Sequence, residues 1–254
     1  MPNDENELAN EVSKHYESLI EEVESLIRVI TFEMRAPLTT IVGYADYLLS
    51  GELETLKDKQ QQAVNHVRMN AKKLFDIINF STDELMLLNL LHGHIKPSLE
   101  RMEIQELLGN ATSQFAEIIE SKNQQLVIDV PEAQYTRSDY YCCEKIFSYL
   151  IDNACKYTKR GGQITVTSRL RSENILITIS DNGIGISKGE QEHIFDNGFR
   201  GSHEVVEQAG GLGRGLYNAK RLAKVLECEM GVKSEVGKGS TFWFTLPLAT
   251  DEEE

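Results

Sequence analysis

The chain has 254 residues, of which 41% are hydrophobic and 26% are charged, and its 40 acidic and 26 basic residues give a net charge of −14. This length is enough for two modest domains, each with its own core. The negative charge argues against a general nucleic-acid or anionic-membrane binder, because such partners attract basic surfaces. The four cysteines have no C-x-x-C spacing, so we expect reduced thiols in a cytoplasmic protein rather than a zinc site or a disulfide framework.

Targeting and membrane signals are missing from the sequence. No apolar run reaches the roughly 18 to 20 residues of a membrane span, and residues 1–7 lack the basic start of a signal peptide. We therefore expect no membrane segment in this chain. A membrane or sensory segment would belong to another chain or to a part that was removed.

The N-terminal third reads as two amphipathic helices. Apolar residues from Leu8 to Leu48 recur at spacings of three and four, which predicts one helix of about 40 residues. Pro37 lies inside this helix and should kink it, and Gly51 is a plausible stop. A second helix follows, for which Thr55 and Asp58 offer a weak capping pair. Its apolar seam has a heptad spacing: Val64, Val67, Ala71, Leu74, Ile78, Ser81, Leu85 and Leu88.

Two such helices joined by a short turn cannot bury both of their apolar stripes alone. We therefore expect residues 1–91 to form a helical hairpin that dimerises into a four-helix bundle. The alternative is that the hairpin packs on the rest of its own chain. Residues 92–103 contain glycine and proline and are interpreted as a linker between domains.

Residues 104–248 alternate between helical and strand patterns. Helices are expected at 104–122, 139–157 and 215–226, strands at 125–130, 162–168, 175–180, 229–234 and 241–246, and a polar segment at 200–208. The whole chain is thus predicted to be α+β, with the hairpin followed by an α/β sandwich whose helices lie on one sheet face. An acidic tail, 249–254, closes the sequence.

Three glycine-bearing stretches in this second domain suggest phosphate binding. They lie at 181–186, directly after a strand, at 210–216, before a helix, and at 237–241, before the last strand. Glycines at a helix start let backbone N–H groups approach phosphates, and the helix N-terminus adds positive partial charge. Each stretch alone is weak evidence, and 210–216 is no dinucleotide fingerprint because no strand leads directly into it.

The three stretches become specific together with Asn-Ala-Cys-Lys-Tyr-Thr at 153–158 and the phenylalanine pattern at 194–200. In this order the five motifs resemble the Asn box, the glycine boxes and the Phe box of sensor histidine kinases of two-component signalling. The resemblance covers residues from about 20 to 248 of this chain. It implies a Bergerat-type ATP-binding domain and makes ATP and magnesium the expected cofactors.

The resemblance also assigns roles to residues. Asp181 would accept a hydrogen bond from the adenine amino group, Tyr157 would pack on the base, and Asn153 would bind magnesium through its amide oxygen. Lys156 and the backbone amides of the second glycine box would face the phosphates, under a lid formed by residues 200–208. The expected ATP-binding residues are Asn153, Lys156, Tyr157, Asp181, Gly183, Gly185, Ile186, Arg200, Gly211, Leu212, Gly213, Arg214, Gly215, Leu216 and Thr241. Carboxylate, amide oxygen and a glycine-rich helix start are chemically suited to these ligands.

Two residues depart from the family pattern within this domain. Arg214 stands where the family usually has leucine, and it either adds a cation near the γ-phosphate or points to solvent, which we favour. Tyr149 replaces a usual asparagine and removes one polar group beside the magnesium site, but Asn153 is retained.

A third departure affects the chemistry directly. Residues 33–39 resemble the family's phosphoacceptor box, and the residue before Glu33 should be the histidine that accepts the γ-phosphoryl group. This residue is Phe32, whose phenyl ring has no nucleophilic nitrogen, so Glu33 remains as a base without its histidine. Ala36 also replaces the Thr or Asn on which the family's phosphatase activity depends. His66 lies on the second helix, exposed and off the seam, and is an improbable substitute acceptor.

Three functional interpretations follow. The first is a pseudokinase that binds ATP, dimerises, and regulates a response regulator or a partner histidine kinase. The second is an active kinase domain that phosphorylates histidine on a partner in trans. The third, another ATPase with the Bergerat fold, is opposed by the helical hairpin and its remnant acceptor box.

Overall fold

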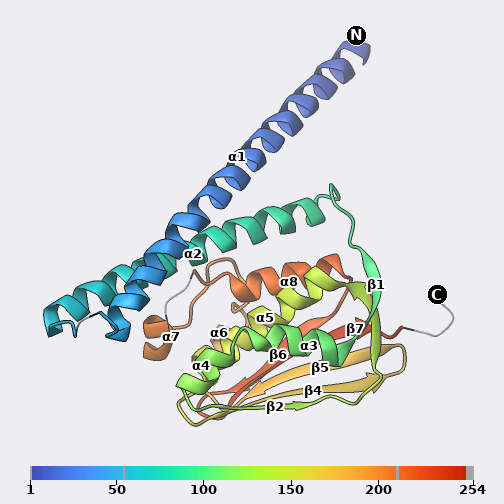
Figure 1. Cartoon of the computed structure of the whole chain (residues 1–254). Helices are drawn as coiled ribbons and strands as arrows, with labels where there is room; N and C mark the ends of the chain where they lie inside the picture. The colour runs from blue at the N-terminus through green and yellow to red at the C-terminus, as the bar shows by residue number, and fades with distance from the viewer. Residues whose placement is uncertain (1, 54, 210–211, 250–254) are drawn as a thin grey trace. The chain divides into compact units, whose positions relative to one another are not determined.

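The computed structural model describes residues 2–53, 55–209 and 212–249, and the chain divides after Asn89 into two compact units (Figure 1). Unit 1 contains α1 (Pro2–Ser50) and most of α2 (Asp58–Leu91). Unit 2 contains every strand of the described residues and the remaining helices. Each unit is described by itself below.

The first helix is longer than the sequence predicts, with 49 residues, and it continues through Pro37. It ends at Ser50, and Gly51 follows with a φ of +80°. A left-handed residue after the last helical residue is the usual C-terminal stop, and glycine adopts it without a steric penalty. At the start of α2, the Gln60 side chain accepts a hydrogen bond from the Lys57 N–H at 3.0 Å, so the cap lies there rather than at Thr55 and Asp58.

The two helices of unit 1 pack through one narrow stripe. Leu38, Ala71 and Ile78 are buried, with Val42 and Phe75 packed against them. Polar contacts flank the stripe: Arg68 pairs with Asp46 at 3.1 Å and Arg35 donates to Asn79 at 3.2 Å. Much of each predicted seam points elsewhere, since these apolar side chains are exposed: Ile30, Met34, Ile41 and Leu48 on α1, and Val67 and Leu74 on α2.

Unit 2 is a sandwich of one helical layer on one sheet. Its helices are α3 (Ile104–Ser113), α4 (Ala116–Ser121), α5 (Tyr140–Tyr157), α6 (Lys188–Gln191), α7 (Glu204–Ala209) and α8 (Gly215–Val225). Its strands are β1 (Leu99–Glu103), β2 (Gln125–Asp129), β3 (Tyr135–Asp139), β4 (Gln163–Arg171), β5 (Asn174–Asp181), β6 (Met230–Glu235) and β7 (Gly239–Pro247). Figure 1 shows α3, α5 and α8 over one face of the sheet, as predicted from the sequence.

The main sheet has the order β2-β4-β5-β7-β6, with β2 parallel to β4 and the other pairs antiparallel. Alternate residues of β4, β5 and β7 point to the helical layer and are almost fully buried, including Ile177 and Phe244 at 0% exposure. Phe147 of α5 meets Phe244 edge to face, with ring centroids 5.0 Å apart. This period-two burial is typical of a sheet covered on one face.

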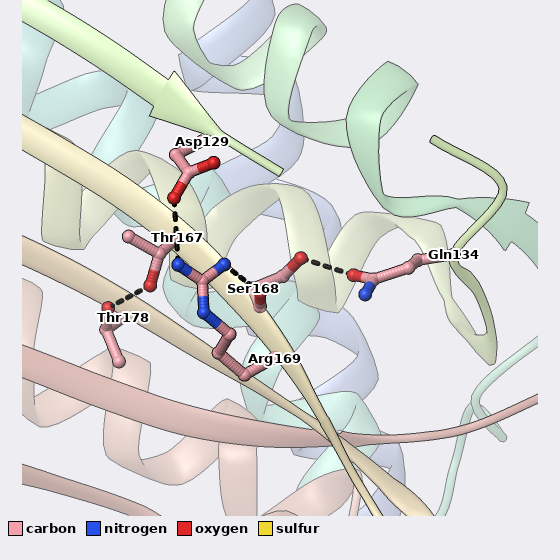
Figure 2. A network of polar contacts seen from close by, with 6 residues as sticks. All are labelled: Asp129, Gln134, Thr167, Ser168, Arg169 and Thr178. Atoms are coloured by element: carbon pink, nitrogen blue, oxygen red, sulfur yellow. Dashed lines mark hydrogen bonds and ion pairs between the residues drawn. The ribbon is translucent and has the colours of Figure 1, made fainter. Parts of the chain in front are cut away.

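A polar network ties the edge of this sheet together (Figure 2). Arg169 of β4 bonds Asp129 of β2 at 2.8 Å, and Thr167 bonds Thr178 across β4 and β5 at 2.7 Å. On the opposite face of β4, the buried Ser168 hydroxyl donates to Gln134 of the segment before β3. The network joins three strands and one loop through side chains as well as through the backbone ladder.

Several features of unit 2 differ from the sequence-based prediction. Residues 99–103, expected within a linker, form β1, which pairs antiparallel with β3, itself not predicted. Both strands carry several charged residues and little apolar alternation, so the usual strand signal is missing. The helix expected at 104–122 is two helices, interrupted at 114–115, and α6 is only four residues long, which is too short for a detectable period.

Candidate functional site

Asp181 is the last residue of β5 and is held by backbone donors. Its Oδ1 accepts hydrogen bonds from the Gly183 N–H at 2.8 Å and from the Ser240 N–H at 3.3 Å. Burial raises the pKa of this carboxyl, and the two hydrogen bonds lower it in part. Both recorded bonds use the same oxygen, so the chain orients the carboxylate while its second oxygen is available to a donor on a ligand.

The start of β7 approaches Asp181 very closely. A Cβ on Gly239 would lie 1.9 Å from the Asp181 carbonyl oxygen, and Gly239 has a φ of +102°. Only glycine fits this position. Beside it is a cavity of about 310 Å³ whose lining includes Asp181 and Thr241 of the predicted site, together with Lys233 and Lys238. Thr241 also bonds Ser180 through their hydroxyls at 2.9 Å.

The C-terminal half of α5 carries Asn153, Lys156 and Tyr157. The helix begins at an Asp139 cap, whose Oδ1 accepts from the Cys142 N–H at 2.8 Å. At the other end, the Tyr157 carbonyl accepts from the Ile184 N–H at 3.2 Å. This bond joins the 153–158 motif directly to the 181–186 motif. The two motifs are thus adjacent in space, although 23 residues separate Thr158 from Asp181 in the chain.

Tyr157 is half-buried, and its burial raises the pKa of its phenol. The charges of Lys156, Asp152 and Arg200 also act on this phenol, so all three groups are near it. The Lys156 ammonium forms an ion pair with Asp152, one helical turn earlier, and both side chains are about one-third exposed. Lys156, which the family resemblance places at the phosphates, is thus paired with a carboxylate of its own helix.

Two residues that the sequence analysis did not single out hold the end of α5. The Lys122 ammonium donates to the carbonyls of Cys155 at 2.7 Å and Lys156 at 2.9 Å, and burial lowers the pKa of this lysine. The Gln124 amide donates to the carbonyls of Cys155 at 3.0 Å and Thr158 at 2.8 Å. Cations and donors satisfy the free carbonyls of a helix end, so this pair fixes the helix that carries the site.

The start of α8 supplies the second glycine motif. Gly215 is the first helical residue, Arg214 precedes it, and both are half-buried. The Tyr149 ring lies against Gly215, because a Cβ there would be 3.4 Å from the Tyr149 Cδ1. Arg214, which we expect to point to solvent, is half-buried. Leu212 is 52% exposed, Gly213 and Leu216 are half-buried, and Gly211 lies outside the described residues.

The remaining ATP-site candidates lie around these elements. Gly185 follows Asp181 in the same loop with a φ of +69°, and the Ile186 N–H donates to the Ser234 hydroxyl at 2.8 Å. Arg200 donates to the Val206 carbonyl within the polar segment 200–208, where α7 was not predicted. The predicted set is thus contributed by β5, the end of α5, the start of α8 and β7.

On α1 of unit 1, Phe32 is 75% exposed, and Glu33 beside it is exposed as well. Phe32 therefore points to solvent and away from the buried stripe of unit 1. No group of three or more His, Cys, Asp or Glu residues is placed to hold a metal within the described ranges. Within the same ranges, no helix is long and apolar enough to cross a membrane.

Comparison with known proteins places this site in a family. Residues 141–250 match the model of the histidine kinase-, DNA gyrase B- and HSP90-like ATPases. The adaptive-response sensory kinase SasA of Crocosphaera subtropica is 26% identical over 243 residues, which cover 93% of this chain and 63% of that protein. The sensor histidine kinase WalK of Bacillus subtilis is 27% identical over 241 residues, 94% of this chain and 39% of that protein. The chain thus spans less than two thirds of the length of these relatives.

Solved structures share the fold. Full-length ShkA, crystallised in complex with AMPPNP, superposes with a TM-score of 0.65 at 24% identity and covers 89% of this chain and 46% of its own. The Acinetobacter baumannii histidine kinase AdeS gives a TM-score of 0.58 at 15% identity, covering 84% of this chain and 96% of its own. Both similarities include the helical region as well as the sandwich, because the sandwich alone is shorter than the share that is covered.

Proposed function

Because this chain belongs to the sensor histidine kinase family, we propose that it is a two-component signalling protein that binds Mg-ATP and dimerises but cannot phosphorylate itself at the usual position. The observation that carries this proposal is Phe32. Its side chain is 75% exposed on α1, immediately before Glu33, where the family resemblance places the phosphoacceptor histidine. A phenyl ring offers no lone pair to a phosphoryl group, whatever the geometry around it.

ATP binding is supported by the way unit 2 brings the motifs together. The Asp181 carboxylate is oriented by two backbone donors, and the Tyr157 phenol lies at the joined end of α5. The AMPPNP complex of ShkA, which shares the fold, is consistent with a nucleotide at this place. In this proposal Asp181 binds the adenine amino group, and Lys156 exchanges Asp152 for a phosphate oxygen.

Magnesium fits the residues that are present. The Asn153 side chain is half-buried on α5, one turn before Tyr157, and has no hydrogen-bond partner among the described residues. A single amide oxygen suits Mg²⁺ in such sites, because the ion keeps several waters and takes other ligands from the substrate phosphates. The ion would neutralise phosphate charge, while Asn153 orients it.

Dimerisation through unit 1 is supported by the apolar side chains that the hairpin does not bury. Ile30 of α1 is 55% exposed, and Val67 and Leu74 of α2 are 52% and 44% exposed. These residues continue the heptad spacing of the predicted seams, so a second hairpin could cover them in a four-helix bundle. The proposed partners are then a second copy of this chain and a response regulator or another histidine kinase.

An alternative is that the domain phosphorylates histidine on a partner in trans. The observation that favours it is that the departures at Phe32 and Ala36 are in unit 1, whereas Asn153, Tyr157 and Asp181 of unit 2 are retained and assembled. Unit 2 could then serve an acceptor histidine that another protein supplies.

One labelling experiment separates these possibilities. The protein is incubated with γ-labelled Mg-ATP alone, with a histidine-bearing dimerisation domain, and as the Phe32→His variant. We expect no acid-labile label on the wild-type chain or on the added domain, and label on Phe32→His if the nucleotide site is competent. Label on the added domain would establish the trans reaction instead, and label on the wild-type chain would overturn the pseudokinase proposal. Failure of the wild-type protein to bind ATP by calorimetry would reject both.

A further inference from the structure

Glu190 occupies the third position of the short helix α6 and completes a capping box with Ser187. Its Oε2 accepts from the Ser187 hydroxyl at 2.7 Å and from the Ser187 N–H at 3.3 Å, while the Ser187 hydroxyl accepts from the Glu190 N–H at 3.3 Å. A capping box needs only one oxygen of the carboxylate. The other oxygen of Glu190 is therefore available for a different contact.

That second oxygen reaches the polar segment 200–208, which we call the lid segment. Glu190 Oε1 accepts from the Ser202 N–H at 2.9 Å and from the Ser202 hydroxyl at 3.2 Å, although twelve residues separate the two positions in the chain. These hydrogen bonds, together with those from Ser187, lower the pKa of Glu190. One carboxylate thus bridges the start of α6 and the start of the lid segment.

The base of this bridge is fixed to the sheet. The Gln191 side chain, next to Glu190, donates to the Ile186 carbonyl at 2.9 Å and to the Ser234 carbonyl of β6 at 3.1 Å. The Ser234 hydroxyl in turn accepts from the Ile186 N–H at 2.8 Å. Ser202 is consequently bonded to α6, and α6 is bonded to β6.

The residues that flank the lid segment on its two sides approach each other. A Cβ on Gly213 would lie 2.6 Å from the Phe199 carbonyl oxygen and 2.8 Å from the Gly198 carbonyl oxygen. Gly213, two residues before α8, is thus in close contact with Gly198 and Phe199 on the other side of the lid segment. Segments whose two ends meet in this way can move as a unit, and their range of motion depends on how the ends are fastened.

We propose that Glu190 is a positioning residue for the nucleotide site, which fastens the lid segment at Ser202 so that only residues after Ser202 move when a triphosphate binds. The inference rests on the proposed ATP function, because it concerns contacts with the phosphates and not with the base. Glu190 itself touches no nucleotide. Its effect is to reduce the number of open conformations from which the lid must close.

Two variants isolate the bridge. In Glu190→Gln the remaining oxygen can satisfy the capping box, since glutamine serves at this position as well as glutamate does, but it cannot also accept at Ser202. Glu192→Gln removes the same charge from an exposed residue two positions along and is the matched control.

The nucleotide readout compares Mg-AMPPNP with adenosine by calorimetry, because adenosine has no phosphates for the lid to cover. We expect Glu190→Gln to weaken AMPPNP binding by about 3- to 10-fold and to leave adenosine binding unchanged, as for the loss of one charge-assisted hydrogen bond. Glu192→Gln should change neither. Equal AMPPNP affinities in the wild type and Glu190→Gln overturn the inference while the ATP function stands. If the wild type binds neither ligand, it is the proposed function that fails.

Backbone hydrogen exchange tests the bridge with no nucleotide present. We expect the Ser202 amide to exchange several-fold faster in Glu190→Gln than in the wild type, with no change in Glu192→Gln. Equal exchange at Ser202 in all three proteins overturns the inference, whatever the nucleotide titrations give.

Discussion

Unit 2 has a core of fully buried large apolar side chains, whereas unit 1 buries only a narrow stripe and leaves many of its apolar side chains exposed to solvent. Ile177 and Leu150 of the sandwich are 0% exposed, and Ile77 and Leu74 of the hairpin are 46% and 44% exposed. The sandwich is therefore complete as a single chain, and the hairpin has apolar surface left to bury. Stability of the first should depend on internal packing, and stability of the second on association.

Truncation of one isoleucine in each unit tests this contrast most strongly. Ile177→Ala should lower the free energy of unfolding of unit 2 by about 3 to 5 kcal/mol, because it leaves a cavity in a closed core. Ile77→Ala should cost under about 1 kcal/mol in dilute protein, since its side chain is half in solvent. Urea unfolding followed by circular dichroism measures both, and similar losses would contradict the contrast.

The sandwich should also tolerate little change where its backbones approach. Gly239→Ala should destabilise unit 2 by about 3 kcal/mol or more, because the new Cβ meets the Asp181 carbonyl at 1.9 Å. Gly237→Ala is the control: its φ is +79°, but a Cβ there meets nothing within 4 Å. It should cost about 1 kcal/mol from backbone strain alone. If thermal unfolding shows the same loss of stability in both variants, the turn moves to make room for the new Cβ at position 239.

A substitution of Asp181 should weaken ATP binding without destabilising the fold. In Asp181→Asn the Oδ1 can still accept from Gly183 and Ser240, so we expect the fold to be retained. An amide nitrogen then replaces the free oxygen and faces the adenine amino group with a second donor. ATP affinity should fall by about 10- to 100-fold in calorimetry, the usual cost of an unpaired polar group in a site. Unchanged affinity would remove Asp181 from the site.

A further prediction concerns dimerisation through the hairpin of unit 1. Leu74→Glu should raise the dimer dissociation constant at least about 10-fold, because a charge enters the apolar face, while Lys73→Glu, exposed one position earlier, should change it little. Sedimentation at several concentrations measures the constants. A dimer that persists equally in both variants would mean that this face of α2 is not the interface.

The smallest expected effect is a pH dependence of the stability of unit 2. Burial raises the pKa of Asp181, so the folded chain holds this proton more tightly than the unfolded chain, whose aspartate titrates near about 3.9. Between the two pKa values the stability contribution of Asp181 therefore falls as pH rises, and ATP binding, which needs the carboxylate, increases. Asp181→Asn should remove this component from stability curves measured across acidic pH. An unchanged slope would mean that burial does not perturb the group.

Elements with a local apolar pattern could be predicted from the sequence. Elements that form only through tertiary contacts could not. The long helices and the main-sheet strands follow from apolar periodicity, and Gly51 follows from a known stop signal. The β1 and β3 strands were missed because they carry charged and polar residues in place of an apolar alternation, and even the buried face of β3 is polar, with Thr136 and Ser138.

The candidate site shows the same division. Motifs identify Asn153, Tyr157 and Asp181 by residue type, but the bond from Ile184 to Tyr157 that brings them together is a backbone contact without a sequence signal. Lys122 and Gln124 hold the end of α5 from outside every motif. Such supporting residues become visible only when the carbonyls that they satisfy are placed in space.

If Lys156 binds a phosphate as proposed, its ion pair with Asp152 makes occupancy of the site an exchange reaction rather than a simple addition. An incoming phosphate has to displace one carboxylate from the ammonium, and the released Asp152 then adds negative charge near a polyanion. A divalent cation that arrives with the nucleotide offsets this repulsion. The proposed site would thereby favour ligands that bring their own positive charge over free inorganic anions.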